Sequence, residues 1–163
     1  MRLDNKRKKV IIIGSGGHAK VVYDALSKST LNIIAIMDIK KKLNEFFYPL
    51  NLIGENDLLI KNYPKDKFIL CNGLGMINVK SNKRKQVYDK LKKRGFSFLT
   101  IKHKFSFVSE SSIILEGAQI MAGAIVQNSS VIGKNTIINT NASVDHDCDI
   151  NDNCHIAPGA TIC

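Results

Sequence analysis

The sequence from Val108 to the C-terminus repeats with a period of six residues. Every sixth residue is Val or Ile: Val108, Ile114, Ile120, Val126, Ile132, Ile138, Val144, Ile150, Ile156 and Ile162. Four residues after each of the first nine comes a small side chain: Ser112, Ala118, Ala124, Ser130, Thr136, Ala142, Cys148, Cys154 and Ala160. A period of six is neither the 3.6 of a helix nor the alternation of an ordinary strand. It therefore predicts a repeat architecture, which outweighs local signals for helix or strand.

A repeat of this length fits a β-solenoid, in which a short extended segment is followed by a corner. The aliphatic side chain would point into a narrow core, and the small one would tolerate crowding at the turn. Residues that accept a positive φ recur at the expected corners: Gly117, Gly123, Gly133, Gly159, Asn128, Asn135 and Asn153. Each coil depends on its neighbours for burial and hydrogen bonds, so residues 108–161 are expected to stack into about three coils.

The N-terminal part has a different pattern, in which strands and helices alternate. Short apolar runs rich in β-branched residues read as buried parallel strands, and the segments between them as helices. The expected strands are residues 10–13, 33–37, 68–71 and 96–101. The expected helices are residues 55–62, residues 83–94, and one with Val21, Val22, Ala25 and Leu26 on one side. The prediction is a small, incomplete Rossmann-like α/β domain.

Charge divides the chain at the same place as the pattern. The formal net charge is +10, and Lys134 is the one cation among 24 Lys and Arg residues that follows Val108. We therefore expect a disordered tail at residues 1–8, the α/β domain at 9–103 and the solenoid at 104–163. A basic domain can indicate nucleic acid, but these lysines are scattered and lack interleaved aromatic residues. A solvated surface is the better interpretation, and no nucleic-acid partner is expected.

The sequence lacks the usual signals for export or membrane insertion. No stretch approaches the roughly 18–20 apolar residues needed to span a bilayer. The apolar run at residues 10–13 is too short for a secretory signal. The four cysteines fit neither a zinc site nor a disulfide framework, and Cys148 and Cys154 occupy small positions of the repeat. These features predict a cytoplasmic protein without membrane insertion.

A glycine-rich loop follows the first expected strand. Gly14, Gly16 and Ala19 match a G-x-G-x-x-A spacing, and Asp38 lies where a ribose-binding acid is found in dinucleotide-binding folds. Such a loop brings backbone N–H groups and a helix N-terminus close to phosphate oxygens. A dinucleotide is one interpretation. A dehydrogenase is disfavoured because the domain is too short for two mononucleotide halves and the repeat domain follows instead of a substrate domain.

Polar residues interrupt the repeat in one region, between residues 139 and 155. His146 lies between Asp145 and Asp147. Asn139 precedes His146 by seven residues, and His155 follows it by nine. A histidine beside a carboxylate is a candidate general base, because its unperturbed pKa is near neutrality and the carboxylate stabilises the imidazolium. Zinc is an alternative, since Asp and His can bind it. Adjacent residues of a strand point to opposite faces, so these three should not converge on one ion, and no metal is expected.

Together, the string at residues 14–19, the Val21-Val22 pair that follows and the hexapeptide domain resemble one bacterial family. It contains the sialic acid O-acetyltransferases and the N-acetyltransferases of nucleotide-linked amino sugars. The resemblance covers residues 9–163. It implies a left-handed parallel β-helix with three hexapeptides per coil, an N-terminal domain that binds the nucleotide-sugar, acetyl-CoA as co-substrate, and a homotrimer with active sites between adjacent solenoids.

The resemblance also implies roles for single residues in the N-terminal domain. Gly16, Gly17 and His18 would contact the phosphates or the sugar, and Asp38 the nucleoside. For His18, a plain surface position at a helix start is the alternative interpretation.

In the solenoid, the resemblance makes His146 the general base and gives Asp147 the task of orienting or polarising it. His155 would contact the thioester region of acetyl-CoA, with Asn139 in support. Relatives often carry Glu after the base, and Asp147 has a shorter side chain.

The expected activity is transfer of an acetyl group from acetyl-CoA to the amino group of a nucleotide-linked amino sugar, in surface-glycan or protein-glycan biosynthesis. Transfer would be direct, since the sequence offers no convincing nucleophilic cysteine. Acetylation of a sialic acid hydroxyl is an alternative. The repeat ends at Cys163 without a cap, whereas family members continue for several coils, so the chain looks truncated. A non-catalytic nucleotide-sugar-binding module is therefore a further alternative.

Overall fold

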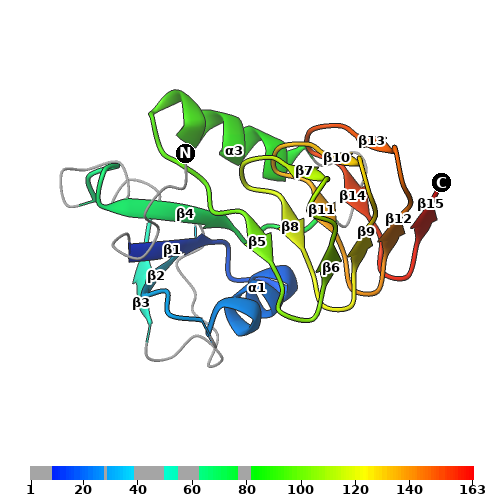
Figure 1. The fold of residues 1–163 in the computed structure, drawn as a ribbon. Helices are drawn as coiled ribbons and strands as arrows, with labels where there is room; N and C mark the ends of the chain where they lie inside the picture. The colour runs from blue at the N-terminus through cyan, green and yellow to red at the C-terminus, as the bar shows by residue number, and fades with distance from the viewer. Residues whose placement is uncertain (1–8, 28, 39–49, 55–62, 77–81) are drawn as a thin grey trace. The chain divides into compact units, whose positions relative to one another are not determined.

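The computed structural model describes residues 9–27, 29–38, 50–54, 63–76 and 82–163. The chain forms two compact units, Met1–Phe98 and Leu99–Cys163, and each is described by itself. Figure 1 shows the α/β elements of the first unit and the stacked short strands of the second. The expected tail at residues 1–8 and the expected helix at 55–62 lie outside the described residues.

The first unit is built on one parallel sheet. Its strands are β1 (Lys9–Ile13), β2 (Ile33–Met37), β3 (Asn51–Ile53) and β4 (Phe68–Asn72), in the order β3-β2-β1-β4. This is the strand order of the first half of a Rossmann fold, as the alternating pattern predicts. The chain leaves β1 to one side and β4 enters on the other. The crevice at the carboxyl ends of these two strands is therefore where such a fold binds ligands.

Two helices cover opposite faces of this sheet. In α3 (Lys83–Lys93), Tyr88 and Leu91 share a core cluster with Ile11 of β1. In α1 (Gly17–Ser27), Ala19 lies against the other face, because a Cβ added to Gly73 would meet both Ala19 Cβ and the Cγ2 of Ile12 within 2.9 Å. Successive residues of a strand face opposite sides, so Ile11 and Ile12 identify the two faces.

Two details of the first unit differ from the expectation. The buried stripe of α1 is Ala19, Val22 and Leu26, whereas Val21 is 46% exposed and does not share a side with Val22. No regular strand spans residues 96–101. Phe98 makes a single parallel bridge to Leu70 of β4, and the chain then enters the second unit.

The second unit is a parallel β-helix of two-residue strands. Its strands are β5 (Ile101–Lys102), β6 (Phe107–Val108), β7 (Ile113–Ile114), β8 (Gln119–Ile120), β9 (Ile125–Val126), β10 (Val131–Ile132), β11 (Ile137–Ile138), β12 (Ser143–Val144), β13 (Asp149–Ile150), β14 (His155–Ile156) and β15 (Thr161–Ile162). They form three parallel sheets. Sheet I holds β5, β8, β11 and β14, sheet II holds β6, β9, β12 and β15, and sheet III holds β7, β10 and β13. The chain visits sheets I, II and III in turn and returns to the same sheet after 18 residues.

The repeat pattern fills the core of the β-helix as predicted. The aliphatic second residue of each strand from Ile120 to Ile150 is buried, and the small residues Ala118, Ala124 and Ala142 belong to the same cluster. Strand β5 is an exception that the repeat pattern did not predict. Lys102 stands at the aliphatic position and is exposed, while Ile101 beside it is buried. The β-helix therefore begins one strand before the first aliphatic residue of the repeat.

From Gly117 onward, each corner of the β-helix has a left-handed backbone position three residues after the aliphatic one. Non-glycine residues hold it at Ser129, Asn135, Asn141, Asp147 and Asn153, with φ between 55° and 60°. This corrects two expectations. Gly133 does not have a positive φ; it is needed because a Cβ there would overlap the backbone of Asn151 and Asp152. Asn128 also lacks a positive φ, and Ser129 takes its place. Asn and Asp tolerate this conformation better than most residues.

Among the described residues, no helix is long and apolar enough to cross a membrane.

Candidate functional site

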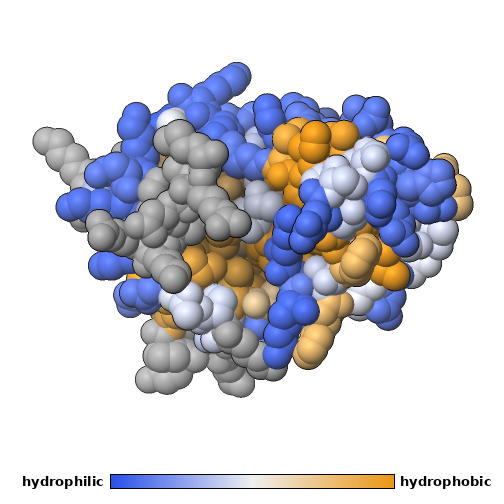
Figure 2. Space-filling model, viewed as in Figure 1, coloured by the Kyte–Doolittle hydropathy of each residue, from blue (hydrophilic) through white to orange (hydrophobic). Residues whose placement is uncertain are grey.

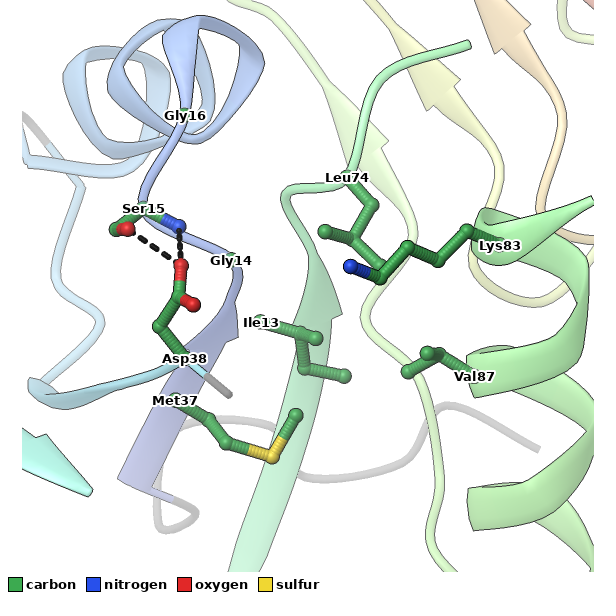
Figure 3. A pocket seen from close by; sticks show the side chains of 9 residues that line it. All are labelled: Ile13, Gly14, Ser15, Gly16, Met37, Asp38, Leu74, Lys83 and Val87. Carbon is green, nitrogen blue, oxygen red and sulfur yellow. Dashed lines mark hydrogen bonds between the residues drawn. The ribbon is translucent and has the colours of Figure 1, made fainter. Parts of the chain in front are cut away.

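A pocket of about 250 Å³ opens at the carboxyl ends of β1, β2 and β4. Its lining comes from the glycine loop, the strand ends and the start of α3: Ile13, Gly14, Ser15, Gly16, Met37, Asp38, Leu74, Lys83 and Val87 (Figure 3). The pocket lies at the crevice between β1 and β4, where the strand order reverses. Apolar side chains and a few polar groups line it together, as in small-molecule sites.

Asp38 is tied to the glycine loop across this pocket. Its Oδ2 accepts hydrogen bonds from the backbone N–H of Ser15, at 2.9 Å, and from the Ser15 hydroxyl. Gly14 has a φ of 90°, and its N–H donates to the carbonyl of Met37, so the loop lies against the end of β2. The sequence places Gly14 and Asp38 in one motif, and the structure brings them into one pocket.

Gly16 lines the pocket, whereas Gly17 and His18 do not. Gly17 begins α1, and His18 is half-buried with its Cβ 3.3 Å from the Cβ position of Gly75, in the loop after β4. Neither Gly16 nor Gly17 has a left-handed φ, and a Cβ added to either would meet no described atom within 4 Å. Packing of the described residues therefore gives no reason for glycine at these two positions.

Lys83 and Ser15 also line the pocket, although the sequence motif did not indicate a role for them. Lys83 is the first residue of α3 and extends into the pocket beside Leu74 (Figure 3). Its amine brings a positive charge to the side of the pocket opposite Asp38. A signal was available, because Lys83, Arg84 and Lys85 place three cations in the first turn of a helix, where they oppose the helix dipole. Helix stability therefore does not explain why three cations lie at this end of the helix.

Arg84 supplies the support behind this wall. Its side chain is 1% exposed, and Nη1 donates to the carbonyls of Asn72, at 2.8 Å, and Leu74, at 2.6 Å. The Asn72 amide returns the contact by donating to the carbonyl of Arg84 and accepting from the N–H of Leu74. Burial lowers the pKa of Arg84 to about 10. The guanidinium thus locks the loop after β4 to the start of α3, and it fixes two walls of the pocket.

In the β-helix, His146 and Asp147 form a pair in the turn between β12 and β13. His146 Nδ1 lies 2.7 Å from Asp147 Oδ2, and the two side chains are 70% and 72% exposed. A carboxylate only accepts, so Nδ1–H donates and the lone pair of the neutral ring lies on Nε2. The hydrogen bond to Asp147, followed by the charges of Asp145 and Asp147, raises the pKa of His146 above its usual value. This geometry suits a general base that acts through Nε2.

Asn139 and His155 form a second pair, with Asn139 Nδ2 and His155 Nε2 2.9 Å apart. Asn139 follows β11 and His155 begins β14, both in sheet I, so the coil repeat brings together residues that are 16 apart in sequence.

The two pairs do not form one cluster within the chain. Asn139 precedes β12 and His146 follows it, so the pairs lie at the two corners on either side of sheet II. The outer face of sheet II between them carries Phe107, 55% exposed, in register with Ile125, 38% exposed. Ile113, on the neighbouring sheet III, is 55% exposed. Figure 2 shows hydrophobic side chains, in orange, at the surface of this unit among hydrophilic ones.

The side chains of residues 145–147 do not alternate as they would along a strand. Asp145, His146 and Asp147 lie in a turn, so the alternation of side chains along a strand does not apply to them. In the part of the chain that the structure describes, no three His, Cys, Asp or Glu side chains are grouped so that they could hold a metal ion.

Comparison with known families identifies both units. Residues 9–91 match the PglD N-terminal domain, and residues 129–163 match the bacterial transferase hexapeptide repeat. The first match alone spans half of the chain. The protein belongs to the PglD-type family of hexapeptide-repeat acetyltransferases. This is the family that the glycine loop and the repeat resemble, so that expectation is confirmed. The comparison with curated proteins gave no match.

Several solved structures are similar to this chain over most of its length. The acetyltransferase domain of PglB from Neisseria gonorrhoeae FA1090 is 32% identical with a TM-score of 0.82, over 94% of this chain and 73% of that one; a second structure of it contains acetyl coenzyme A. PerB from Caulobacter crescentus, in complex with CoA and GDP-perosamine, is 31% identical with a TM-score of 0.79, over 94% and 70% of the two chains. WeeI from Acinetobacter baumannii AYE shares the fold at 20% identity, with a TM-score of 0.77 over 95% and 72%.

Proposed function

We propose that this PglD-type protein transfers the acetyl group of acetyl-CoA to the amino group of a nucleotide-linked amino sugar, in bacterial surface-glycan or protein-glycan biosynthesis. The observation that carries the proposal is the His146–Asp147 pair, which leaves Nε2 of a histidine with raised pKa as a proton acceptor on the β-helix. PerB, a relative of the same architecture, is a GDP-perosamine N-acetyltransferase, which supports a nucleotide-linked amino sugar as the acceptor.

The reaction that fits these residues is direct. The acceptor amine attacks the thioester carbonyl carbon and forms the C–N bond while His146 Nε2 takes a proton from the nitrogen. The C–S bond then breaks, and the proton passes from His146 to the departing CoA thiolate, which leaves as the thiol. Asp147 holds the ring by Nδ1–H and stabilises the imidazolium that forms between these steps. The base is needed because positive charge would otherwise develop on the attacking nitrogen as the C–N bond forms, and the amine would then be readily expelled again.

The pocket of the first unit is the proposed nucleotide site. Backbone N–H groups at the start of α1 and the positive end of its dipole suit a diphosphate. Asp38 provides a carboxylate for ribose or base, and Lys83 adds a cation to the opposite wall. Gly16 and Gly17 leave open space that the described packing does not require. A bound phosphate would explain both glycines, and His18 at the same loop keeps its proposed contact with phosphate or sugar.

We propose a homotrimer of left-handed β-helices with the active sites between copies. His146 follows β12 in sheet II, whereas His155 begins β14 in sheet I, so we expect a second copy to bring a base and a thioester contact together. The exposed Phe107 and Ile125 lie on sheet II and favour its burial by a neighbour. A cyclic trimer repeats such a two-sided contact three times and closes.

The cytoplasm is the proposed location. All four cysteines are free in the structure, and free thiols persist in a reducing compartment. Acetyl-CoA is the co-substrate that the residues suit, since the reaction requires an activated acyl group and the β-helix presents a base without a nucleophile.

The experiment is an acceptor panel with acetyl-CoA, in which release of free CoA thiol is measured. UDP- and GDP-linked amino sugars, free amino sugars and free sialic acid are the arms. Turnover with a nucleotide-linked amino sugar is expected, and His146→Ala should lower kcat by about 100- to 10,000-fold at an unchanged melting temperature, because the ring is exposed. Turnover with sialic acid alone would instead establish the hydroxyl acceptor. Binding of the nucleotide sugar without turnover in any arm would refute the proposed transfer and favour a binding module.

A further inference from the structure

Lysines that are scattered along the sequence gather at one edge of the sheet in the first unit. Lys9 begins β1, and its N–H donates to the carbonyl of Lys67, directly before β4, at 3.2 Å. Lys65 reaches the end of α3, because its Nζ lies 2.9 Å from the position that a Cβ on Gly95 would take. These positions lie at the amino ends of the parallel strands, where α3 also ends. The residues that we call the amino-edge patch are all exposed: Lys9, Lys65, Lys67, Lys93 and Arg94.

The charges of the amino-edge patch are not neutralised by the part of the chain that the structure describes. None of the five side chains has a hydrogen bond or ion pair with a described residue, whereas Lys85 of α3 pairs with Asp89. Asp66 is exposed between Lys65 and Lys67 in the sequence and pairs with neither. Neighbouring strands lie about 4.8 Å apart, within the Debye length of about 8 Å, so like charges at their starts repel each other. An anion outside the chain would relieve this repulsion.

Helix stability explains only part of this arrangement. Cations at the end of a helix interact favourably with its dipole, which accounts for Lys93 and Arg94. Lys9 and Lys67 lie at strand starts, and a sheet has little net dipole, so the fold does not need positive charge there. Asp24, an exposed acid toward the same edge, lies on α1 and hence on the opposite face of the sheet. The amino-edge patch is therefore a surface of one sign that the fold does not require.

The amino-edge patch lies away from the pocket. The pocket opens at the carboxyl ends of β1, β2 and β4, whereas the patch lies at the amino ends of the same sheet. A partner on the patch would thus leave the pocket open to a soluble ligand. Four of the five cations are lysines, which carry a compact point charge on a flexible stem and lack the planar fork with which Arg recognises a single phosphate group. Such an array suits many anionic groups spread over a surface.

We propose that the amino-edge patch docks this protein on a membrane surface that carries anionic phospholipids, with no segment inserted. Each Lys or Arg close to such a surface strengthens binding about fivefold, and the effects of several cations multiply. The attraction is electrostatic, so added salt weakens it. The docking does not rest on the proposed acetyl transfer, because none of the five residues lines the pocket or belongs to the β-helix.

The test is sedimentation of the full chain with vesicles, measured as the fraction of protein in the pellet. Vesicles of phosphatidylcholine mixed with phosphatidylglycerol supply the anionic surface, and vesicles of phosphatidylcholine alone are the neutral comparison. The protein is expected to bind the mixed vesicles at low ionic strength, to be released as salt is added, and to leave the neutral vesicles unoccupied. Absence of binding to the mixed vesicles at low ionic strength overturns the proposal, and so does equal binding to both kinds.

The combined substitutions Lys65→Gln, Lys67→Gln and Lys93→Gln test the patch itself. Binding to the mixed vesicles should weaken about 100-fold, since each substitution removes a contribution of about fivefold. The three side chains are exposed, so the melting temperature should not change. Full retention of vesicle binding in this variant would overturn the proposal.

The matched control combines Lys102→Gln, Lys104→Gln and Lys134→Gln, which remove three exposed charges from the β-helix. Charges outside the contact are screened by salt, so vesicle binding should change by less than about threefold. Equal losses in the two variants would assign the binding to net charge and overturn the role of the patch. Duplex DNA is the other polyanion to compare. DNA binding without vesicle binding would show that the patch recognises nucleic acid and would overturn the membrane docking.

Discussion

His146 donates from Nδ1 to Oδ2 of Asp147 at 2.7 Å, while Asp147 itself occupies a left-handed corner of the β-helix with a φ of 57°. One residue therefore meets a demand of the fold and a demand of the proposed chemistry. Asp suits both, because its short polar side chain tolerates a positive φ and its carboxylate reaches the neighbouring ring. Asp147→Asn separates these two demands, because Asn still tolerates the positive φ but lacks the carboxylate charge.

Asp147→Asn should move the pH profile of kcat to lower pH. Asp147 and Asp145 raise the pKa of His146, and the base acts when unprotonated, so wild-type activity should increase as pH rises through that pKa. Removal of the Asp147 charge lowers this pKa, and the acidic limb should shift down while the plateau falls. The measurement is kcat against pH with saturating substrates.

Asp145→Asn is the matched comparison, since it removes the second cause of the raised pKa and leaves the Nδ1 hydrogen bond. Its shift should be smaller and in the same direction. Identical profiles for wild type and Asp147→Asn would contradict the assigned base.

Gly16→Ala should separate binding from folding. A Cβ at Gly16 would meet no described atom within 4 Å and the backbone is not left-handed, so the melting temperature should not fall. If phosphate approaches this backbone, the methyl group should raise the KM for the nucleotide sugar about tenfold. That change corresponds to a loss of about 1.4 kcal/mol of binding free energy. Gly73→Ala, where a Cβ would lie 2.7 Å from the carbonyl of Ile13, should instead lower stability. An unchanged KM in Gly16→Ala would place the phosphate elsewhere.

Lys83→Met should weaken nucleotide-sugar binding without a loss of stability. The methylenes that cover Leu74 are retained and only the charge is lost, so the KM should rise several-fold to tenfold and become less sensitive to salt. Lys85→Met is the control on the same helix, because Lys85 pairs with Asp89 on the surface, at 2.5 Å, and does not line the pocket. An equal rise in KM in the two variants would show that the overall positive charge of the helix, and not a contact inside the pocket, causes the effect.

Arg84→Met should destabilise the first unit by about 2–4 kcal/mol. The variant keeps most of the volume but leaves the carbonyls of Asn72 and Leu74 without their charged donor in a buried setting. Chemical denaturation with a two-unit analysis measures this. Arg94→Met, at the exposed end of the same helix, should change stability by less than about 0.5 kcal/mol. A silent Arg84→Met would show that the guanidinium does not hold the loop.

Phe107→Lys combined with Ile125→Lys should convert the proposed trimer to a monomer. Two charges on the apolar face of sheet II would have to be buried in the contact. Sedimentation velocity reports the change, and activity should fall with it because His146 and His155 of different copies would separate. Val21→Lys places the same charge at an exposed apolar position of the other unit and should leave the assembly intact.

Most of the fold could be predicted from local periodicity in the sequence. The six-residue repeat alone predicted parallel stacking, an aliphatic core and crowded corners, because every coil presents the same environment to the same position. The β-branched runs and the glycine loop likewise predicted the α/β unit and placed Gly14 and Asp38 in one motif. Lys102 occupies an aliphatic position and so breaks the repeat. Strand β5 forms by pairing with β8, and it therefore has no periodic signal in the sequence.

The family, the α/β unit and the β-helix could be predicted from local sequence patterns, and His146 could be named as a candidate base. The contacts that surround these residues depend on the fold. Arg84 appears in sequence as one more cation on a basic helix, yet strand order buries it against the loop after β4. Asn139 meets His155 because one coil stacks on the next, although the two residues are 16 apart in sequence. Spacing in the chain encodes repeating environments, whereas contacts between elements depend on sheet order and stacking.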